Sequence, residues 1–175
     1  MERIIIEPND FNSDLIKLWS KKWMLLTSGS YESADYNTMT VGWGSIGVMW
    51  NKPFVQVVVR PTRHTFKYME KYDSFTLTAF PDKYNDKLKY LGTVSGKDEN
   101  KINKSELTVI SSKKISSPGF DEAELIIECK KIYWDDIRPK NFLDNKIDEN
   151  YNANDYHRIY FGEILLIEGV IKYKK

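Results

Sequence analysis

Two arginines and two threonines stand where an apolar strand pattern runs directly into a helix pattern, in the segment Val59-Arg60-Pro61-Thr62-Arg63-His64-Thr65. The first turn of a helix carries backbone N–H groups without intrahelical partners and the positive end of the helix dipole, so it attracts phosphate. The arginines would add charge-assisted donors, and the hydroxyls would add neutral ones. The segment therefore predicts a phosphate site. An ordinary helix N-cap flanked by solvated arginines is the alternative interpretation.

A second set of possible phosphate donors follows at Ser95, Gly96 and Lys97, with Lys101 four residues further on. They would supply a hydroxyl, a freely placed amide and two ammonium groups. Such residues are common in exposed loops, so this pattern is weak by itself. The sequence contains neither a G-x-x-x-x-G-K-[ST] loop nor a G-x-G-x-x-G turn after a strand, which excludes the two best-known nucleotide motifs.

Groups for nucleophilic or metal chemistry are scarce. One cysteine and two histidines are too few for a cysteine-rich or histidine-rich metal centre, so we predict no metal. Cys129 alternates with Leu125 and Ile127, as expected for a small buried side chain. His157 enters an apolar strand, where it could bond a ligand or donate a proton, or equally be a hydrogen-bonded residue at the strand end.

Charge and hydropathy exclude several classes of partner. The chain of 175 residues has 26 Lys and Arg against 25 Asp and Glu, a net charge of +1, which does not favour nucleic acid or an anionic membrane surface. No apolar run approaches the roughly 20 residues of a membrane span, and the acidic N-terminal segment does not resemble a signal peptide. We therefore expect a cytoplasmic protein with a single domain over residues 1–175.

The elements that must position these groups are mainly strands. Alternating or β-branched runs predict six strands, at residues 23–28, 36–43, 54–59, 74–80, 123–134 and 156–173. Helical spacing predicts peripheral helices near residues 11–19, over 62–72 with Thr62 as N-cap, and over 84–91 with a stop at Gly92. The polar stretch 135–155 is long for a structureless loop, so it should carry a turn or helix of its own or pack on a neighbour. This order favours an antiparallel sheet or barrel, a mostly β fold, over a doubly wound sheet.

In four segments the sequence resembles the FMN-binding split-barrel proteins of the flavin reductase-like family, and within it the flavoredoxin-type branch. The segments are Asn37-Thr38-Met39-Thr40 leading to Trp43-Gly44, the 59–65 run, Gly92-Thr93-Val94-Ser95-Gly96 with Lys101, and Tyr156-His157-Arg158-Ile159-Tyr160-Phe161-Gly162-Glu163. They occur in the family's order and span most of the chain. The resemblance implies a six-stranded Greek-key split β-barrel and a homodimer that binds FMN.

The resemblance also implies roles for individual residues. Thr38, Met39 and Thr40 would lie along the flavin ring and ribityl chain, largely through backbone groups, and His157 would lie near the reactive side of the ring. The expected phosphate-binding residues are Arg60, Thr62, Arg63, Thr65, Ser95, Gly96 and Lys101. Asn37 and Pro61 complete the two motifs as cofactor-binding residues. The departures at Gly42 and Ser45, where relatives commonly carry a small polar residue and Gly, concern specificity more than flavin binding.

The activity that the resemblance implies is that of an FMN-dependent oxidoreductase, which takes reducing equivalents from NAD(P)H and passes them to free flavin or a protein acceptor. One alternative is a flavoredoxin-like electron carrier that a redox partner protein reduces. Another is a non-catalytic module that binds a different phosphorylated ligand. The sequence leaves open the choice between NADH and NADPH, and whether FMN is a prosthetic group or a substrate.

Overall fold

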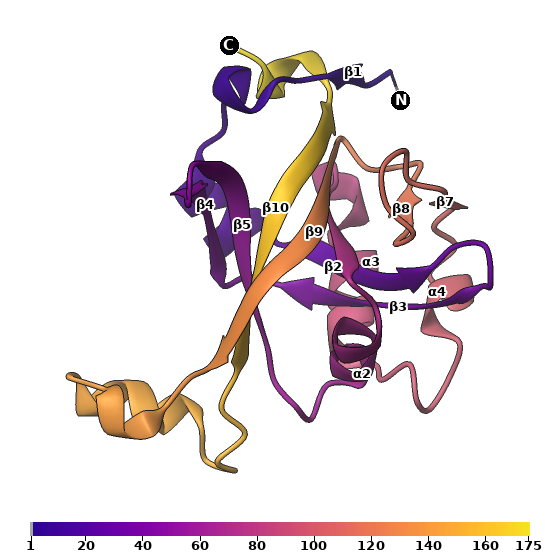
Figure 1. Cartoon of the computed structure of the whole chain (residues 1–175). Coiled ribbons are helices and arrows are strands. Elements are labelled where there is room, and N and C mark those ends of the chain that lie inside the picture. Colours follow the sequence, from indigo (N-terminus) through magenta and orange to yellow (C-terminus); the bar gives the residue numbers. More distant parts are fainter. Residues whose placement is uncertain (1) are drawn as a thin grey trace.

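The computed structural model describes residues 2–175, and its centre is one antiparallel sheet in the order β3-β2-β6-β9-β10-β5-β4 (Figure 1). The six predicted strands are all present. They are β2 (Met24–Ser30), β3 (Asp35–Val41), β5 (Lys52–Val59), β6 (Ser74–Ala79), β9 (Leu125–Asp136) and β10 (Arg158–Gly169). The prediction of a mostly β fold with peripheral helices is confirmed.

The structure adds strands that the sequence pattern did not predict. β4 (Gly44–Met49) pairs with β5 through a two-residue turn at Trp50 and Asn51, whose φ angles are 53° and 58°. Such turns usually carry Asn-Gly or Asp-Gly, so the Trp-Asn pair gives no hairpin signal. The short strand β1 (Ile4–Ile5) pairs with β10, and β7 (Val109–Ile110) with β8 (Gly119–Phe120) forms a separate ribbon.

Side chains are buried on both faces of the curved sheet. The sheet curves around one face, and helices and loops cover the other. One cluster, which includes Met39, Val57, Phe75 and Cys129, fills the space between the strands. A second, which includes Leu25 and Leu91, lies under α3 and α4. Every residue of β6 is buried, so alternation along that strand does not separate core from solvent.

Peripheral helices occur where helical spacing predicts them, with different ends. α1 (Leu15–Lys17) continues as a π turn over Leu18–Lys22, and the others are α2 (His64–Lys71), α3 (Asn85–Thr93) and α4 (Lys101–Lys104). Thr62 is not the N-cap of α2: the cap residue is Arg63, and no side chain caps the helix. α3 ends at Thr93, one residue beyond the predicted stop at Gly92, and the glycine packs on Thr40, where a Cβ would come within 2.8 Å.

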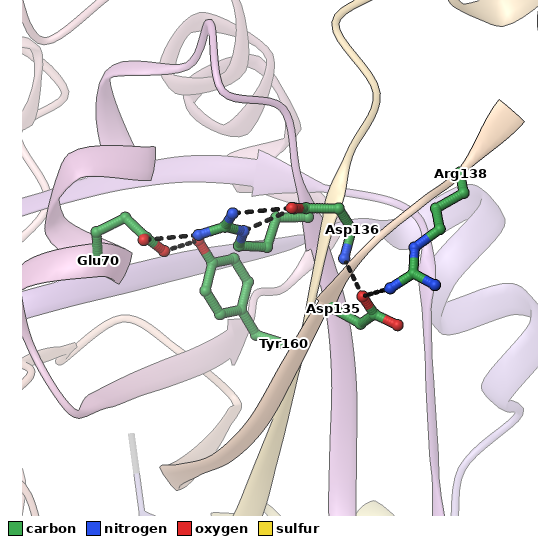
Figure 2. A network of polar contacts seen from close by, with 6 residues as sticks. Glu70, Asp135, Asp136, Arg138 and Tyr160 are labelled. Atoms are coloured by element: carbon green, nitrogen blue, oxygen red, sulfur yellow. Dashed lines mark hydrogen bonds and ion pairs between the residues drawn. The ribbon is translucent and has the colours of Figure 1, made fainter.

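An ion-pair network fastens α2 to the sheet at the ends of β9 and β10 (Figure 2). The Arg158 guanidinium donates two hydrogen bonds to Asp136, at 2.7 and 2.9 Å, and a third to Glu70 of α2 at 2.8 Å. The hydroxyl of Tyr160 donates to the other oxygen of Glu70. These contacts fix the orientation of α2, and with it the segment that leads into that helix.

Beyond the network, residues 137–157 leave the sheet between β9 and β10 and project from the body of the molecule, as the orange segment of Figure 1 shows. They contain 3-10 helices at Pro139–Asn141 and Asn145–Asn150, as predicted for a stretch of this length. Two further 3-10 turns, Pro8–Asp10 and Ile171–Tyr173, lie near the chain ends, and one at Asp82–Tyr84 precedes α3. Among the described residues, no helix has the length and apolar character needed to cross a bilayer.

Candidate functional site

A small cavity of about 80 Å³ lies where the start of α2 meets the segment after α3 and the first residue of α4. Of the residues predicted to hold phosphate, Thr62, Arg63, Thr65, Ser95 and Lys101 line this cavity, together with Met39 of β3. The two sequence segments that carry possible phosphate donors, more than 30 residues apart, therefore meet in space.

The charges on this small cavity are unbalanced. Lys101 is 4% exposed, and its Nζ donates to the carbonyl oxygens of Leu91 and Val94 at 2.6 and 2.9 Å. Burial, and then the nearby positive charge of Arg63, lower the pKa of Lys101 to about 8. Within residues 2–175, neither cation pairs with a carboxylate. Two cations without a counter-charge suit an anionic ligand.

Neutral donors point to the same place. The Oγ1 atom of Thr65 accepts a hydrogen bond from the Asn37 amide at 2.7 Å, which leaves the threonine proton free to donate. The amides of His64 and Thr65 lie in the first turn of α2 and have no intrahelical acceptor. The small cavity thus combines charged and neutral donors of the kind that phosphate oxygens accept.

A larger cavity of about 390 Å³ adjoins the small one, with Met39, Arg63, Gly92 and Thr93 common to both. Its volume lies in the range of sites for small organic ligands. The other lining residues are Trp23, Thr40, Val41, Gly42, Trp43, Val58, Arg60, Leu88, Lys89 and His157. The shared residues make the two cavities parts of one groove, with a cationic end and a broader, partly aromatic end.

Two exposed indoles border the broad end of this groove. Trp23 and Trp43 are 39% and 51% exposed, which is unusual for side chains of this size. Trp23 has φ of 57°, a conformation that costs about 1 to 3 kcal/mol for a residue other than glycine. Flat apolar side chains held at a cavity rim suit a planar ligand.

His157 lies at the broad end with a nearly buried ring. Its Nδ1 is 2.9 Å from the hydroxyl of Tyr151, and its ring centroid is 5.3 Å from that of Trp43. Burial lowers the pKa of His157 to about 4, and the positive charge of Arg60 makes a smaller contribution. The imidazole is therefore neutral near pH 7.

Comparison with known proteins shows which family the chain belongs to. Residues 19–168 match the model of the flavin reductase like domain. The chain belongs to the flavin reductase-like family. This membership supports a flavin-related redox function and confirms the resemblance deduced from the four motifs.

This flavin reductase-like chain is similar to curated proteins of Pyrococcus abyssi and Archaeoglobus fulgidus. An uncharacterized protein of Pyrococcus abyssi is 26% identical over 151 residues, which cover 85% of this chain and 73% of the relative. An uncharacterized protein of Archaeoglobus fulgidus is 26% identical over 96 residues, 55% of this chain. The match spans 54% of the Archaeoglobus protein, about half of its length.

Solved structures share the fold at low identity. A flavoredoxin of Desulfovibrio vulgaris superposes with a TM-score of 0.67 at 20% identity, over 89% of this chain and 73% of that chain. An FMN-binding domain of a flavin reductases-like enzyme from Shewanella baltica gives 0.68 at 14%, over 96% and 77%. An NADH:FAD oxidoreductase of Streptomyces globisporus gives 0.62 at 13%, over 83% and 74%. The fold is therefore the predicted split barrel.

Some predicted cofactor residues of the flavin reductase-like chain lie away from the groove. The Thr38 side chain lines neither cavity, and its hydroxyl accepts a hydrogen bond from the Thr27 hydroxyl and donates one to the Leu26 carbonyl. Pro61 is exposed in the turn before α2 and lines neither cavity. Asn37 and Gly96 contact each other so closely that a Cβ on the glycine would come within 2.3 Å of the Asn37 oxygen. Both line a neighbouring polar cavity instead.

Arg60 borders the larger cavity only, and its guanidinium is already engaged. It donates to Asp155 at 2.7 Å and to the Asn150 carbonyl at 2.8 Å, and it lies 5.0 Å from the ring centroid of Tyr151. The arginine therefore anchors the projecting segment 137–157 beside the groove.

Sequence reasoning missed several residues that border the groove. The sequence pattern places Trp23 at the beginning of a strand and gives it no other role, and His64 lies inside the phosphate motif without being a predicted ligand. Tyr151, which lines neither cavity but contacts His157, lies in the polar stretch 135–155, where periodicity gives no information on contacts. Exposure of an indole is a property of the folded chain, so only Trp43, between Gly42 and Gly44, had a sequence signal.

Proposed function

We propose that this chain is an FMN-binding oxidoreductase of the flavin reductase type, which passes reducing equivalents from NAD(P)H to free flavin or to a protein acceptor. The observation that supports it best is the unbalanced cation pair Arg63 and Lys101 on the small cavity, joined to a groove wide enough for a planar ring. The flavin reductase-like domain would take up the whole chain, residues 1–175.

The donor set fits the phosphate of FMN. Near neutral pH this group carries close to two negative charges, which would balance Arg63 and Lys101. The hydroxyls of Thr65 and Ser95 would complete the contacts, whereas that of Thr62 donates to Asp155 at 3.2 Å, and Met39 and Thr40 would lie beside the ring and ribityl chain. Bound flavin would supply the hydride and electron chemistry.

The protein would then contribute position and surroundings. Trp23 and Trp43 would limit water at the ring edge, and His157 would offer a neutral hydrogen-bonding group beside them. A homodimer in the cytoplasm, with the groove completed near the subunit boundary, belongs to the same proposal and derives from the family resemblance.

The first test is the visible spectrum of the purified protein, followed by titration with FMN under anaerobic conditions. We expect flavin absorption bands, and bleaching of bound flavin by NADH or NADPH. Bleaching by a reduced ferredoxin but by neither nicotinamide would favour a flavoredoxin-like carrier, for which the shared fold of the Desulfovibrio flavoredoxin is the supporting observation. A colourless protein that does not bind FMN would contradict the proposal and favour a non-catalytic module.

A further inference from the structure

The projecting segment 137–157 places one tyrosine directly behind the histidine of the groove. Tyr151 is 5% exposed and His157 is 8% exposed, and the hydroxyl of the first lies 2.9 Å from Nδ1 of the second. The rings are nearly perpendicular, with centroids 5.5 Å apart. This hydrogen bond connects a tyrosine outside the four family motifs to a histidine that lines the larger cavity.

Hydrogen-bond balance decides which partner donates. Among residues 2–175, the Tyr151 hydroxyl has no acceptor other than Nδ1 of His157. If Nδ1 carried the proton, the tyrosine would only accept, and a buried O–H would be left without a partner, at a cost of about 1 to 3 kcal/mol. If the tyrosine donates, the Tyr151 O–H and the Nδ1 lone pair of His157 each have a hydrogen-bond partner. The neutral imidazole then carries its proton on Nε2.

Nε2 is the free end of this pair. It has no hydrogen-bond partner in the described part of the chain. It is nevertheless accessible, because the only fully buried side-chain nitrogen or oxygen without a partner among those residues is Nε1 of Trp19. Because His157 lines the larger cavity, this N–H remains available to a molecule that enters the groove.

Polar contacts hold the tyrosine in place from the barrel side. Asp155 accepts hydrogen bonds from Arg60 at 2.7 Å and from the Thr62 hydroxyl at 3.2 Å, and the Asn150 carbonyl accepts another from Arg60. The Arg60 guanidinium also stacks near the Tyr151 ring. The 3-10 helix that ends at Asn150 is thus fixed to the rim of the groove rather than only tethered by its ends.

We propose that Tyr151 is a positioning residue, which donates a hydrogen bond to Nδ1 of His157 and so holds Nε2–H as a neutral donor toward the ligand of the larger cavity. The ligand class that suits this donor is a planar heterocycle with an acceptor oxygen or nitrogen at its edge. The inference rests on the proposed function only for the identity of that heterocycle as flavin.

The surroundings of His157 agree with a neutral donor. The charged groups that face it are Arg60 and Arg63, which oppose protonation, and Asp155, which favours it, while burial has the largest effect and lowers the pKa to about 4. Asp155 is itself paired with Arg60, so its effect is reduced. His157 would therefore donate a hydrogen bond at neutral pH without acting as an imidazolium acid.

The decisive measurement is the ¹⁵N NMR spectrum of the imidazole groups in flavin-free protein near pH 7. The chain has only two histidines, so a His64→Gln variant assigns the signals. We expect His157 to show a protonated Nε2 and an unprotonated Nδ1. A spectrum with the proton on Nδ1 overturns the inference without recourse to any variant, and it leaves the flavin proposal untouched.

Two matched variants test the role of the hydroxyl. Tyr151→Phe removes the donor and keeps the ring, and Tyr156→Phe makes the same change at a neighbouring hydroxyl that bonds Asp148. We expect Tyr151→Phe to mix the His157 tautomers and to raise its titration midpoint by about one pH unit or more, and Tyr156→Phe to change neither. Equal behaviour of the two variants would overturn the inference.

The same pair of variants separates this role from flavin binding. FMN affinity depends mainly on Arg63 and Lys101 at the cationic end of the groove, so we expect Tyr151→Phe to weaken FMN binding without abolishing it, and Tyr156→Phe to bind FMN as the wild type does. If Tyr151→Phe retains FMN binding while its His157 tautomer changes, both proposals stand. If no variant binds FMN but the tautomers follow the expectation, only the flavin proposal fails.

Discussion

Lys101 concentrates the electrostatic argument in one side chain. Its ammonium group is buried, two of its protons are donated to the carbonyls that end α3, and Arg63 is the charged group that acts on it most. A lysine buried only to cap a helix would gain stability from a nearby carboxylate, and the described residues supply none. The third ammonium proton and the uncompensated charge are what a phosphate would use.

Arg63→Ala tests the cationic end with little risk to folding, because the side chain is exposed and donates only to the Gly92 carbonyl. We expect FMN to bind more weakly by about 1.5 to 3 kcal/mol, as for the loss of a charge-assisted hydrogen bond. Flavin fluorescence quenching measures the affinity. Riboflavin, which lacks the phosphate, is the control ligand and should bind both proteins alike. Adding Arg60→Ala to Arg63→Ala should weaken FMN binding little further, since Arg60 is paired with Asp155.

The ionisation of Lys101 predicts a pH dependence of FMN binding. With a pKa of about 8 in the ligand-free protein, the ammonium group loses its proton as the pH rises through that value. Phosphate favours the charged form, so binding should take up a proton and weaken as the pH rises from 7 to 9. Titrations in two buffers with different ionisation enthalpies would detect the proton. A pH-independent FMN affinity would remove Lys101 from the phosphate site.

At the scale of elements, the strands were predictable because their residue types are favourable for β structure over long runs. Val57 to Val59 and the alternating Ser74 to Phe80 leave little choice of conformation. β4 was not predictable, since its turn uses positive φ at Trp50 and Asn51 and its outer residues are exposed. The predicted end of α3 at Gly92 was one residue early, and the close packing of Gly92 on Thr40 is a tertiary contact that local sequence does not encode.

The candidate site was predictable only in part, for a related reason. Residues that act through their position next to α2, such as Arg63 and Thr65, follow from the strand-to-helix pattern. Arg60 lies in the same motif, but its guanidinium direction depends on Asp155, which is 95 residues away. Contacts of this kind form only in the folded chain, and a single sequence, considered without an alignment, gives no signal for them.

The network around Arg158 connects α2 to the sheet and predicts a measurable difference between two similar variants. Arg158→Gln removes three hydrogen bonds that join Asp136 and Glu70, and the arginine is largely shielded from solvent. We expect a loss of about 1 to 3 kcal/mol in the free energy of unfolding, measured with urea. Arg138→Gln removes one exposed ion pair to Asp135 and should cost less than about 0.5 kcal/mol. Equal losses would contradict a structural role for the network.

At the scale of the whole molecule, an exposed group of aromatic side chains gives the proposed homodimer a testable surface. Trp50 and Tyr133 are 56% and 44% exposed, and both rings contact Phe161 of the central strand β10. We expect sedimentation at micromolar concentration to give twice the monomer mass of 20.6 kDa. The double variant Trp50→Ser with Tyr133→Ser should shift the protein toward monomer. Ile171→Ser, at the exposed C-terminal turn, is the control and should not. A monomeric wild type would contradict the dimer.

Stability in acid should reflect His157, because its pKa is about 6.5 in the unfolded chain and about 4 in the folded one. Between these values the unfolded state binds more protons, so the free energy of unfolding decreases as the pH falls from about 6.5 to 4, by at most about 3 kcal/mol. Carboxyl groups titrate in the lower part of this range, and comparison with His157→Asn subtracts their contribution. Urea unfolding at pH 7 and pH 4.5 should therefore show a smaller decrease for the variant than for the wild type. Parallel decreases would mean that the pKa of His157 is not lowered in the folded protein, so that the imidazole is already protonated at mild acidity.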